Sequence, residues 1–193
     1  MAKAPVPGFA KTRLIPDVGA HAAAVLAERL TERAVQTALA AEVGPVTLWC
    51  TPDAAHATFL RLAQRYPVTL AAQPQGDLGA RMLACMTDGP TLVTGSDCPA
   101  LTPAHLQDAA RALHDADVVL IPAEDGGYVL IGSRTPQPGV FSEMTWGTDT
   151  VLDETRKRIS ALGLSAVELA PLWDVDTESD LARMERELPE LAL

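Results

Sequence analysis

The sequence predicts a three-layer α/β domain in which a mostly parallel sheet is covered by helices on both faces. Apolar runs of four or five residues, typical of buried strands, alternate with longer stretches whose apolar residues recur at helical spacing. Strands separated by helices are the pattern of parallel sheets. An Asp-Gly-Gly turn at residues 125–127, between two apolar runs, indicates one antiparallel pair within that sheet.

The individual elements follow from the same periodicity. The first long helix is expected at residues 20–42, where Leu26 and Leu30 belong to an apolar stripe. The last helix is expected to begin at Thr177, because Thr177 and Asp180 have the spacing of a capping box. Other helices are expected at 52–65, 77–87, from 103 and at 148–162, and strands at 46–50, 68–72, 91–94, 118–121, 128–131 and 166–169.

Length and composition restrict the classes of protein. The 193 residues suit a single domain, residues 1–193. The formal net charge of −10 argues against a nucleic-acid partner and against an anionic membrane surface. No apolar run approaches the roughly 20 residues of a membrane span, and no secretory signal pattern is present. The odd set Cys50, Cys85 and Cys98 lacks CxxC spacing and indicates a cytoplasmic protein.

The charges are unevenly distributed along the chain. Residues 1–81 carry 8 basic and 6 acidic side chains, whereas residues 82–193 carry 7 basic and 19 acidic ones. Such a division suits phosphate binding by the first part and cation binding by the second, or it reflects two differently solvated surfaces.

The first motif that suggests chemistry is KAPVPGFAKTRL at residues 3–14. Its prolines and Gly8 impose a non-helical path, while Lys3, Lys11 and Arg13 bring three cations into one short segment. Lysine binds phosphate as a point charge and arginine as a bidentate fork. The motif therefore predicts a phosphate-binding loop, and the alternative is an exposed turn with solvated cations.

The second motif, QPQGDLGAR at residues 73–81, passes from a strand end into a helix, where free backbone N–H groups attract anions. Gln75 and Gly76 precede the helix, so Gln75 is a candidate to contact a base edge. Arg81, one turn into the helix, is a candidate phosphate ligand. The alternative is a simple turn and N-cap at residues 76–77.

Two acidic motifs suggest a divalent cation. Asp97 in TGSDCP directly follows an expected strand, where open α/β sheets place their ligands. In WDVDT, alternation places Asp174 and Asp176 on one face, and Asp176 precedes the last helix. Carboxylates are the ligands that Mg²⁺ prefers, so Asp97 and Asp176 are the candidate metal ligands. A turn residue and a helix cap are the alternatives.

The fourth motif in chain order, EDGGY at residues 124–128, suggests an acceptor site, and WDVDT is the fifth. Asp125 is a candidate to orient an acceptor hydroxyl or to act as a general base. Gly126 and Gly127 permit close approach of a ligand, with Tyr128 beside them. Trp146 is a candidate wall of the same site. The alternatives are a tight turn between strands and, for Trp146, an ordinary core position.

The motifs, taken in this order, resemble the DUF2064 family of glycosyltransferase-A-like proteins. The matching segments are AKAPVPGFAKTRL, QPQGDLGARM, TGSDCPAL, PAEDGGYVLIG and WDVDTESDL, which together span residues 2–181. The resemblance implies a nucleotide-diphospho-sugar transferase fold that binds a nucleotide with Mg²⁺ or Mn²⁺. It also implies a hydrophobic strand before AKAPVPG, so we expect this first strand to be missing from the sequence.

The resemblance also implies roles for individual residues. Lys11 and Asp125 are the expected catalytic residues, and Asp97 and Asp176 are the expected metal ligands. TGSDCP holds one aspartate rather than the Asp-x-Asp of many sugar transferases, so Asp97 would need help from Asp176. The nucleotide and its phosphates are expected to contact Lys3, Gly8, Lys11, Arg13, Gln75, Gly76 and Arg81, and the acceptor Gly126, Gly127, Tyr128 and Trp146.

These assignments predict a metal-dependent transferase that uses a nucleotide sugar or a nucleoside triphosphate, with an acceptor that the sequence does not identify. Glycosyl transfer, which releases a nucleoside diphosphate, is favoured. A guanylyltransferase-like nucleotidyl transfer, which releases pyrophosphate, is the alternative within the same site. A nucleotide-binding module without catalysis is the alternative from another class.

Overall fold

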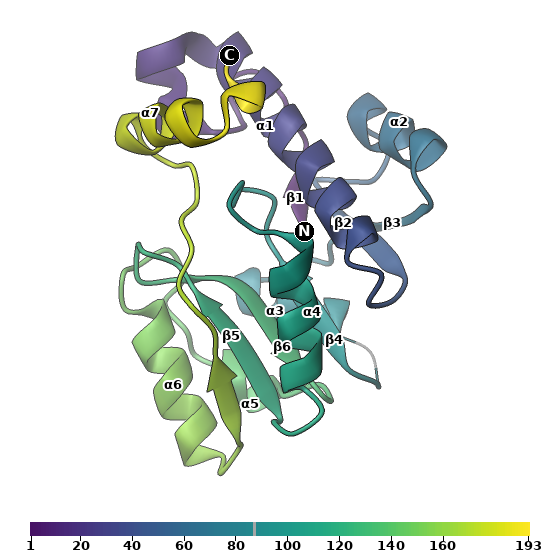
Figure 1. The fold of residues 1–193 in the computed structure, drawn as a ribbon, viewed down its shortest axis with the longest axis vertical. Helices are drawn as coiled ribbons and strands as arrows, with labels where there is room; N and C mark the ends of the chain where they lie inside the picture. The colour runs from purple at the N-terminus through teal and green to yellow at the C-terminus, as the bar shows by residue number, and fades with distance from the viewer. Residues whose placement is uncertain (87) are drawn as a thin grey trace. The chain divides into compact units, whose positions relative to one another are not determined.

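The computed structural model describes residues 1–86 and 88–193, which form two compact units (Figure 1). Unit 1 comprises Met1–Gln73, Gly95–Leu101 and Trp173–Leu193. Unit 2 comprises Pro74–Thr94 and Thr102–Leu172. Each unit is thus assembled from segments that are distant in the sequence, and each is described by itself.

Unit 1 contains a parallel sheet of three strands. Its order is β1 (Ala2–Lys3), β2 (Val46–Thr51) and β3 (Val68–Ala72), and Ala2 lies opposite Cys50 in the register. The sequence analysis placed Lys3 at the start of a loop and predicted no strand before it. Ala2 and Lys3 are instead strand residues, and the Ala4 N–H continues their pairing by donating to the Thr51 carbonyl at 2.8 Å. The following loop is therefore attached directly to a sheet.

The helices of unit 1 begin where local caps and turns place them. Gly19 has φ 82° and ψ 158° and interrupts α1 (Ile15–Ala40), so the regular helix resumes at residue 20, the predicted start. α2 (Ala57–Arg65) begins later than predicted because the His56 side chain accepts a hydrogen bond from the Thr58 N–H at the helix start. The predicted capping box of α7 (Glu178–Glu187) is confirmed. Two short 3-10 helices complete the unit, η1 (Thr12–Leu14) and η2 (Pro189–Leu191).

Two apolar clusters fill unit 1. One cluster packs η1 and α1 against the C-terminal segment that contains α7 and η2. The other lies between the sheet and its helices. The first contains Leu14, Leu26, Leu30, Trp173, Val175, Leu181, Met184 and Leu191, and the second Ala2, Ala4, Val35, Leu48, Cys50, Phe59 and Leu62.

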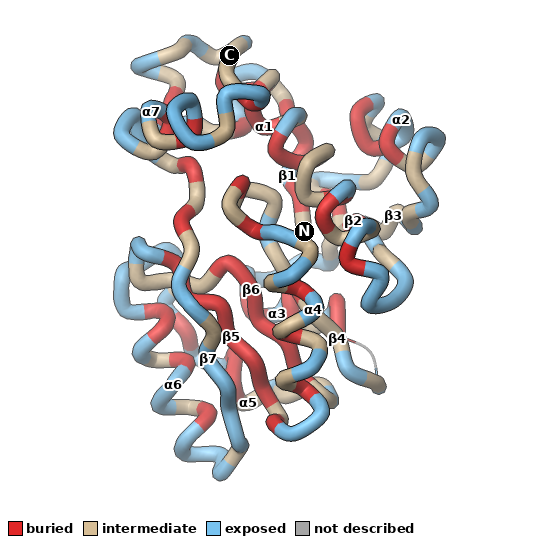
Figure 2. The backbone as a smooth tube through the Cα atoms, viewed as in Figure 1, coloured by how far each residue is buried: buried red, intermediate tan, exposed pale blue. Residues whose placement is uncertain are grey.

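Unit 2 contains a mixed sheet in the order β4-β6-β5-β7. β6 (Tyr128–Ser133) pairs antiparallel with β4 (Thr91–Thr94) and with β5 (Val118–Pro122), whereas β5 pairs in parallel with β7 (Ala166–Glu168). The antiparallel pair predicted around residues 125–127 is confirmed as β5 and β6. The sequence did not predict the second antiparallel pair, β6 with β4. β5 and β6 are buried almost throughout (Figure 2), which accounts for their continuous apolar sequences.

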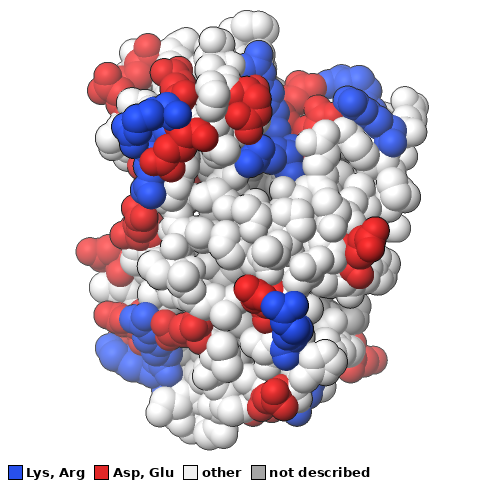
Figure 3. All heavy atoms as spheres, viewed as in Figure 1, with Lys and Arg blue, Asp and Glu red and all other residues white. Residues whose placement is uncertain are grey.

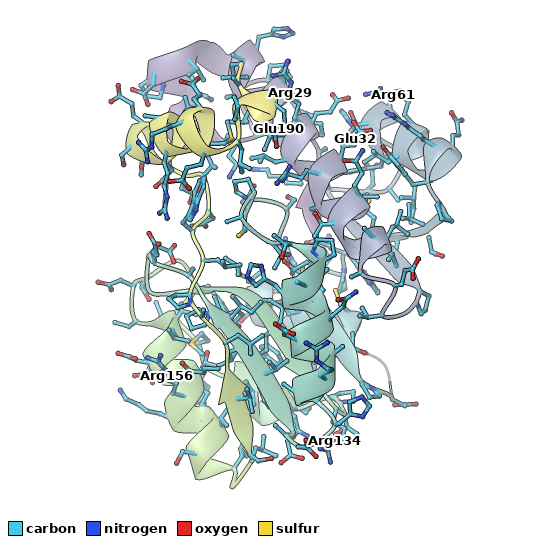
Figure 4. All side chains as sticks on the ribbon, in the orientation of Figure 1. Arg29, Glu32, Arg61, Arg134, Arg156 and Glu190 are labelled. Carbon is cyan, nitrogen blue, oxygen red and sulfur yellow. The ribbon has the colours of Figure 1, made fainter. Side chains whose placement is uncertain are left out.

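Four helices complete unit 2: α3 (Leu78–Cys85), α4 (Pro103–Ala112), α5 (Pro138–Phe141) and α6 (Val151–Ala161). Residue 87, the predicted end of the third helix, lies outside the described residues. α5 was not predicted from the sequence. The Arg134 side chain (Figure 4) donates to the carbonyls of Leu113, His114 and Ala116 at 3.0–3.2 Å and so caps the end of α4.

Many charged side chains form local ion pairs. Arg65 pairs with Glu32 at 2.7 Å within unit 1, and Arg156 pairs with Glu168 at 2.8 Å within unit 2. Figure 3 shows acidic and basic side chains next to each other on the visible face. Much of the acidity of the chain is thus ordinary surface. Within residues 1–86 and 88–193, no helix has both the length and the apolar character needed to cross a membrane.

Replacing a buried phenylalanine tests the second apolar cluster of unit 1. Phe59→Ala should lower the free energy of unfolding by about 3–5 kcal/mol, because Phe59 is fully buried and its truncation leaves a cavity. Phe9 is 65% exposed, so Phe9→Ala is the matched control and should change the free energy of unfolding by less than about 0.5 kcal/mol. Urea unfolding followed by circular dichroism measures both; equal effects would contradict the assigned packing.

The start of β5 gives a pH-dependent prediction. The Ser165 hydroxyl and N–H donate to Asp117 Oδ2 at 2.7 and 2.9 Å, and these bonds lower the pKa of the Asp117 carboxyl. A lowered folded-state pKa stabilises the fold above the unfolded value of about 4, and this contribution is lost as the pH falls through the folded value. Asp117→Asn should therefore destabilise the protein at pH 7.

The difference in unfolding free energy between wild type and Asp117→Asn should shrink below about pH 4. Urea unfolding from pH 3 to 7 measures it. Asp115→Asn, two residues earlier and exposed, is the control and should show no such difference. A difference between wild type and Asp117→Asn that is independent of pH would contradict the role of the carboxylate.

Candidate functional site

The ammonium group of Lys11 is the centre of a charged cluster in unit 1. Lys11 Nζ lies 2.7 Å from Asp97 Oδ1, 3.2 Å from Asp176 Oδ1 and 2.6 Å from the Val175 carbonyl oxygen. The Lys11 side chain is only 5% exposed, whereas the side chains of Asp97 and Asp176 are 49% and 36% exposed. The first, third and fifth motifs in chain order are therefore brought together around one cation.

Local structure fixes the position of Lys11. Its backbone has φ 46° and ψ 46°, a left-handed conformation that costs a lysine about 1–2 kcal/mol, and its carbonyl accepts the Leu14 N–H at 3.0 Å. Leu14 and Val175 are fully buried in the same apolar cluster. The Val175 N–H donates to the Asp97 carbonyl at 3.0 Å. Main-chain bonds and apolar packing thus hold together the segments that carry the charges.

Asp176 is also positioned by the start of α7. Asp180 Oδ2 accepts hydrogen bonds from the N–H groups of Asp176 at 3.1 Å and of Thr177 at 2.8 Å. The capping spacing of Thr177 and Asp180 signalled this helix start in the sequence, but not its role in holding Asp176. No sequence signal could have shown that the Val175 carbonyl accepts a hydrogen bond from Lys11, because every residue has a main-chain carbonyl.

The other cations of the first motif have different surroundings. Arg13 donates to Asp176 Oδ2 at 3.2 Å and is 69% exposed, so most of its guanidinium faces solvent. Lys3 is exposed on β1, and no bond from its side chain to Lys11, Asp97 or Asp176 joins it to the cluster. Gly8 has φ 85° in the exposed turn before Lys11, a conformation that favours glycine.

The electrostatics of the cluster keep Lys11 charged. Burial lowers the pKa of Lys11, but the ion pairs with Asp97 and Asp176 outweigh this effect, and the net pKa is raised. Burial raises the pKa of the neighbouring Cys98 thiol to about 12, and the negative charges of Asp174 and Asp97 add to the increase. Asp174, half-buried, therefore also lies close to this cluster.

The oxygen atoms around Lys11 are also the donors that could hold a divalent cation. Two carboxylates and one main-chain carbonyl converge on one point, and oxygen donors of this kind suit Mg²⁺. In the part of the chain that the structure describes, no group of three or more His, Cys, Asp or Glu side chains forms a metal site. Mg²⁺ is commonly held by one or two carboxylates plus substrate phosphates, so the donor set fits such a cation.

In unit 2, the EDGGY motif forms a tight turn. Asp125 Oδ1 accepts a hydrogen bond from the Gly127 N–H at 2.9 Å. The Asp125 side chain is exposed, and its Oδ2 takes no part in this bond. Gly126 has φ 91°, and a Cβ there would overlap the main-chain carbonyl of Asp149. Leu152 N–H donates to the Gly126 carbonyl at 2.9 Å. The turn therefore packs directly on the segment before α6, a contact that sequence reasoning missed.

The second motif forms the predicted helix start. Asp77 caps α3 by accepting the Ala80 N–H at 2.8 Å, and Arg81 Nε donates to the Gly76 carbonyl at 3.0 Å. Gln75 is exposed before this turn, and Gly76 has φ 126°. Arg81 thus closes the turn that follows Gln75, and its Nε–H is used within the protein in this hydrogen bond.

Two aromatic residues of the predicted acceptor site are half-buried in unit 2. The Tyr128 hydroxyl lies 3.9 Å from Met82 Sδ, and burial raises the pKa of Tyr128. The Trp146 ring lies against Gly79, where a Cβ would overlap it. Trp146 Nε1 is buried without a hydrogen-bond acceptor among the described residues. Both aromatic side chains therefore pack against α3, Tyr128 on Met82 and Trp146 on Gly79.

The sequence matches a protein family over residues 34–148, more than half of the chain. The family is described as "Uncharacterized protein conserved in bacteria (DUF2064)". The chain therefore belongs to the DUF2064 family, as its motifs predicted. No curated protein matches the sequence.

Solved structures show the same fold. A putative nucleotide-diphospho-sugar transferase from Desulfovibrio desulfuricans G20 is 31% identical, with a TM-score of 0.85 over 97% of this chain and 86% of that one. 4-Diphosphocytidyl-2C-methyl-D-erythritol synthase from Anaerococcus prevotii DSM 20548 is 10% identical, with a TM-score of 0.61 over 83% and 89% of the two chains. Rv0371c from Mycobacterium tuberculosis H37Rv is 17% identical, with a TM-score of 0.56 over 82% and 85%.

These comparisons define the fold class. The first similarity confirms the predicted α/β fold of the nucleotide-diphospho-sugar transferase type. The sequence predicted one mostly parallel sheet, whereas the described strands form a parallel sheet in unit 1 and a mixed sheet in unit 2.

The packing of the EDGGY turn gives a prediction that is independent of function. Gly126→Ala should lower the free energy of unfolding by about 2–4 kcal/mol, because the new Cβ meets main-chain atoms that cannot rotate away and the φ value is strained. Gly89→Ala is the control, since a Cβ there has nothing within 4 Å. Thermal unfolding by calorimetry measures both, and unchanged stability of Gly126→Ala would show that the turn adopts another conformation.

Proposed function

We propose that this protein is a transferase that takes its transferred group from a nucleotide-activated donor, and that the transferred group is a sugar. The observation that carries the proposal is the cluster of Lys11 and Arg13 with Asp97 and Asp176 at the loop after β1. Two cations on a rigid loop suit the phosphates of a donor, and two converging carboxylates suit a divalent cation bound to them.

Mg²⁺ or Mn²⁺ is the cofactor that we assign to this site, with Asp97 and Asp176 as its protein ligands. When bound, such an ion neutralises the charge that develops on the leaving phosphate. Arg13 adds a guanidinium that is already exposed toward solvent, and Lys11 adds the ammonium charge of the same loop. Lys3 and Gly8 belong to the loop as its first cation and its turn residue.

We assign the two turns of unit 2 to the base and the acceptor. The exposed amide of Gln75, presented by the turn at Gly76 and Arg81, suits a base edge. Asp125 suits an acceptor hydroxyl, because its carboxylate is exposed and its orientation is fixed by the Gly127 N–H. The three free thiols support the cytoplasmic location inferred from the sequence.

The experiment that tests this function is a panel of nucleoside diphosphates, triphosphates and nucleotide sugars, each with Mg²⁺, Mn²⁺ or a chelator. Isothermal calorimetry and thermal shift measure binding. The proposal predicts that at least one nucleotide raises the melting temperature and that the increase depends on the metal ion. The absence of a response to every nucleotide would refute both the transferase and a nucleotide-binding module without catalysis.

The products decide which bond is broken. Glycosyl transfer releases a nucleoside diphosphate, whereas nucleotidyl transfer releases pyrophosphate. With the nucleotide found in the binding panel, chromatography of the reaction mixture should therefore detect free diphosphate. Pyrophosphate instead would reassign the protein to the nucleotidyl transferases, and binding without either product would favour the non-catalytic module.

Removing one carboxylate tests the proposed metal ligands. Asp97→Ala should abolish the metal-dependent part of nucleotide binding; the variant should still fold, but with lower stability, because the buried Lys11 ammonium loses one of its two carboxylate partners. Asp108→Ala is the matched control: Asp108 is a surface aspartate that pairs with Arg111 on α4. Calorimetric titration with and without chelator measures the effect, and an unchanged metal dependence in Asp97→Ala would refute the assignment.

A further inference from the structure

All hydrogen-bonding capacity of the Lys11 ammonium is used inside the protein. An ammonium group has three N–H donors, and three oxygen atoms lie within 3.2 Å of Lys11 Nζ. Two of the oxygens are carboxylate oxygens, of Asp97 and Asp176, and the third is the Val175 carbonyl oxygen. In this conformation Lys11 has no donor left for a phosphate.

The exposure of the cluster is asymmetric. The Lys11 side chain is 5% exposed, whereas the carboxylates that hold it are 49% and 36% exposed. A ligand from solvent therefore reaches the carboxylates of Asp97 and Asp176 but not the ammonium. A phosphate cannot contact Lys11 until the ammonium leaves its three oxygens.

A divalent cation and the ammonium compete for the same atoms. Mg²⁺ requires its oxygen ligands at about 2.0–2.1 Å, closer than the oxygens around Lys11 Nζ, and it repels an ammonium at the same point. The formal charges of Lys11, Arg13, Asp97 and Asp176 sum to zero, and the nearby Asp174 adds one negative charge. Adding a divalent cation alone makes the net charge of these five side chains and the ion positive, and an arriving phosphate group offsets that charge.

We propose that Lys11 is an exchangeable internal counter-ion: its ammonium occupies the cation position between Asp97 and Asp176 in the free protein and moves to the donor phosphate when that position receives a divalent cation. The divalent cation and the phosphate then increase each other's affinity. The cation displaces the Lys11 ammonium, which can then contact the phosphate, and the phosphate holds the ammonium away from the cation position. Such coupling is reciprocal. The proposal rests on the proposed function for the identity of the phosphate, but its first test needs no nucleotide.

That first test measures the affinity of the free protein for Mn²⁺ alone. Lys11→Met keeps a similar chain length and removes the charge, so the carboxylates lose their internal counter-ion. The variant should bind Mn²⁺ about tenfold or more tightly than wild type, measured as free Mn²⁺ by electron paramagnetic resonance. Lys157→Met is the matched control, because Lys157 is an exposed lysine paired with Glu154 on α6, and it should bind Mn²⁺ as wild type does.

The double variant Lys11→Met with Asp97→Ala locates the gained affinity. The gain should disappear, since one of the two carboxylates is gone. An affinity of Lys11→Met equal to that of wild type would overturn the proposal, and so would a gain that persists in the double variant. A response of wild type to nucleotides together with no gain in Lys11→Met would refute the counter-ion while leaving the proposed function in place.

A second measurement uses the unmodified protein and so does not depend on the folding of a variant. The chain has only three lysines, Lys3, Lys11 and Lys157, so ¹⁵N-lysine labelling resolves their ammonium groups by nuclear magnetic resonance. Lys11 should give a signal protected from solvent exchange. Mg²⁺ with pyrophosphate should shift it or remove its protection, with Lys3 and Lys157 as internal references. An unchanged Lys11 signal when calorimetry shows binding would overturn the exchange.

Discussion

Three oxygen atoms share the ammonium group of Lys11, and unit 1 is organised around that interaction. The partners come from the turn at Asp97 and from the C-terminal segment at Val175 and Asp176, the latter 165 positions along the chain from Lys11. A buried ammonium without such partners would be strongly destabilising, so the three segments have to meet. The apolar cluster of Leu14 and Val175 holds them beneath the charges.

The same interaction links stability to function. Under the proposed function, the carboxylates that hold the lysine in the free protein are also the oxygen donors for a divalent cation, and the loop cation that stabilises the fold is also a phosphate ligand. Unit 2 uses another device, close packing of glycines: Gly126 lies on the Asp149 carbonyl and Gly79 on the Trp146 ring. These contacts fix the EDGGY turn and the first turn of α3, while Asp125 and Gln75 beside them stay exposed.

The sequence anticipated the elements whose signals are local. The helix that resumes after Gly19, the capping box at Thr177 and the antiparallel turn at residues 125–127 all depend on neighbouring residues, and all three predictions agree with the structure. The start of α2 was predicted too early, because the cap at His56 outweighs the helical pattern before it. The contact of the Tyr128 hydroxyl with Met82 Sδ had no local signal in the sequence, and the role of Tyr128 at an acceptor site stays a prediction.

The sequence by itself determined the family, the α/β class and the residue types of the candidate site, because motif order and periodicity are local properties of the chain. Only the tertiary structure decided that Lys11 lies between Asp97 and Asp176 and that the Val175 carbonyl completes its surroundings. The sequence motifs predicted candidate phosphate-binding cations and candidate metal-binding aspartates separately. Their mutual pairing depends on distances between segments far apart in the chain, which apolar packing and main-chain hydrogen bonds set.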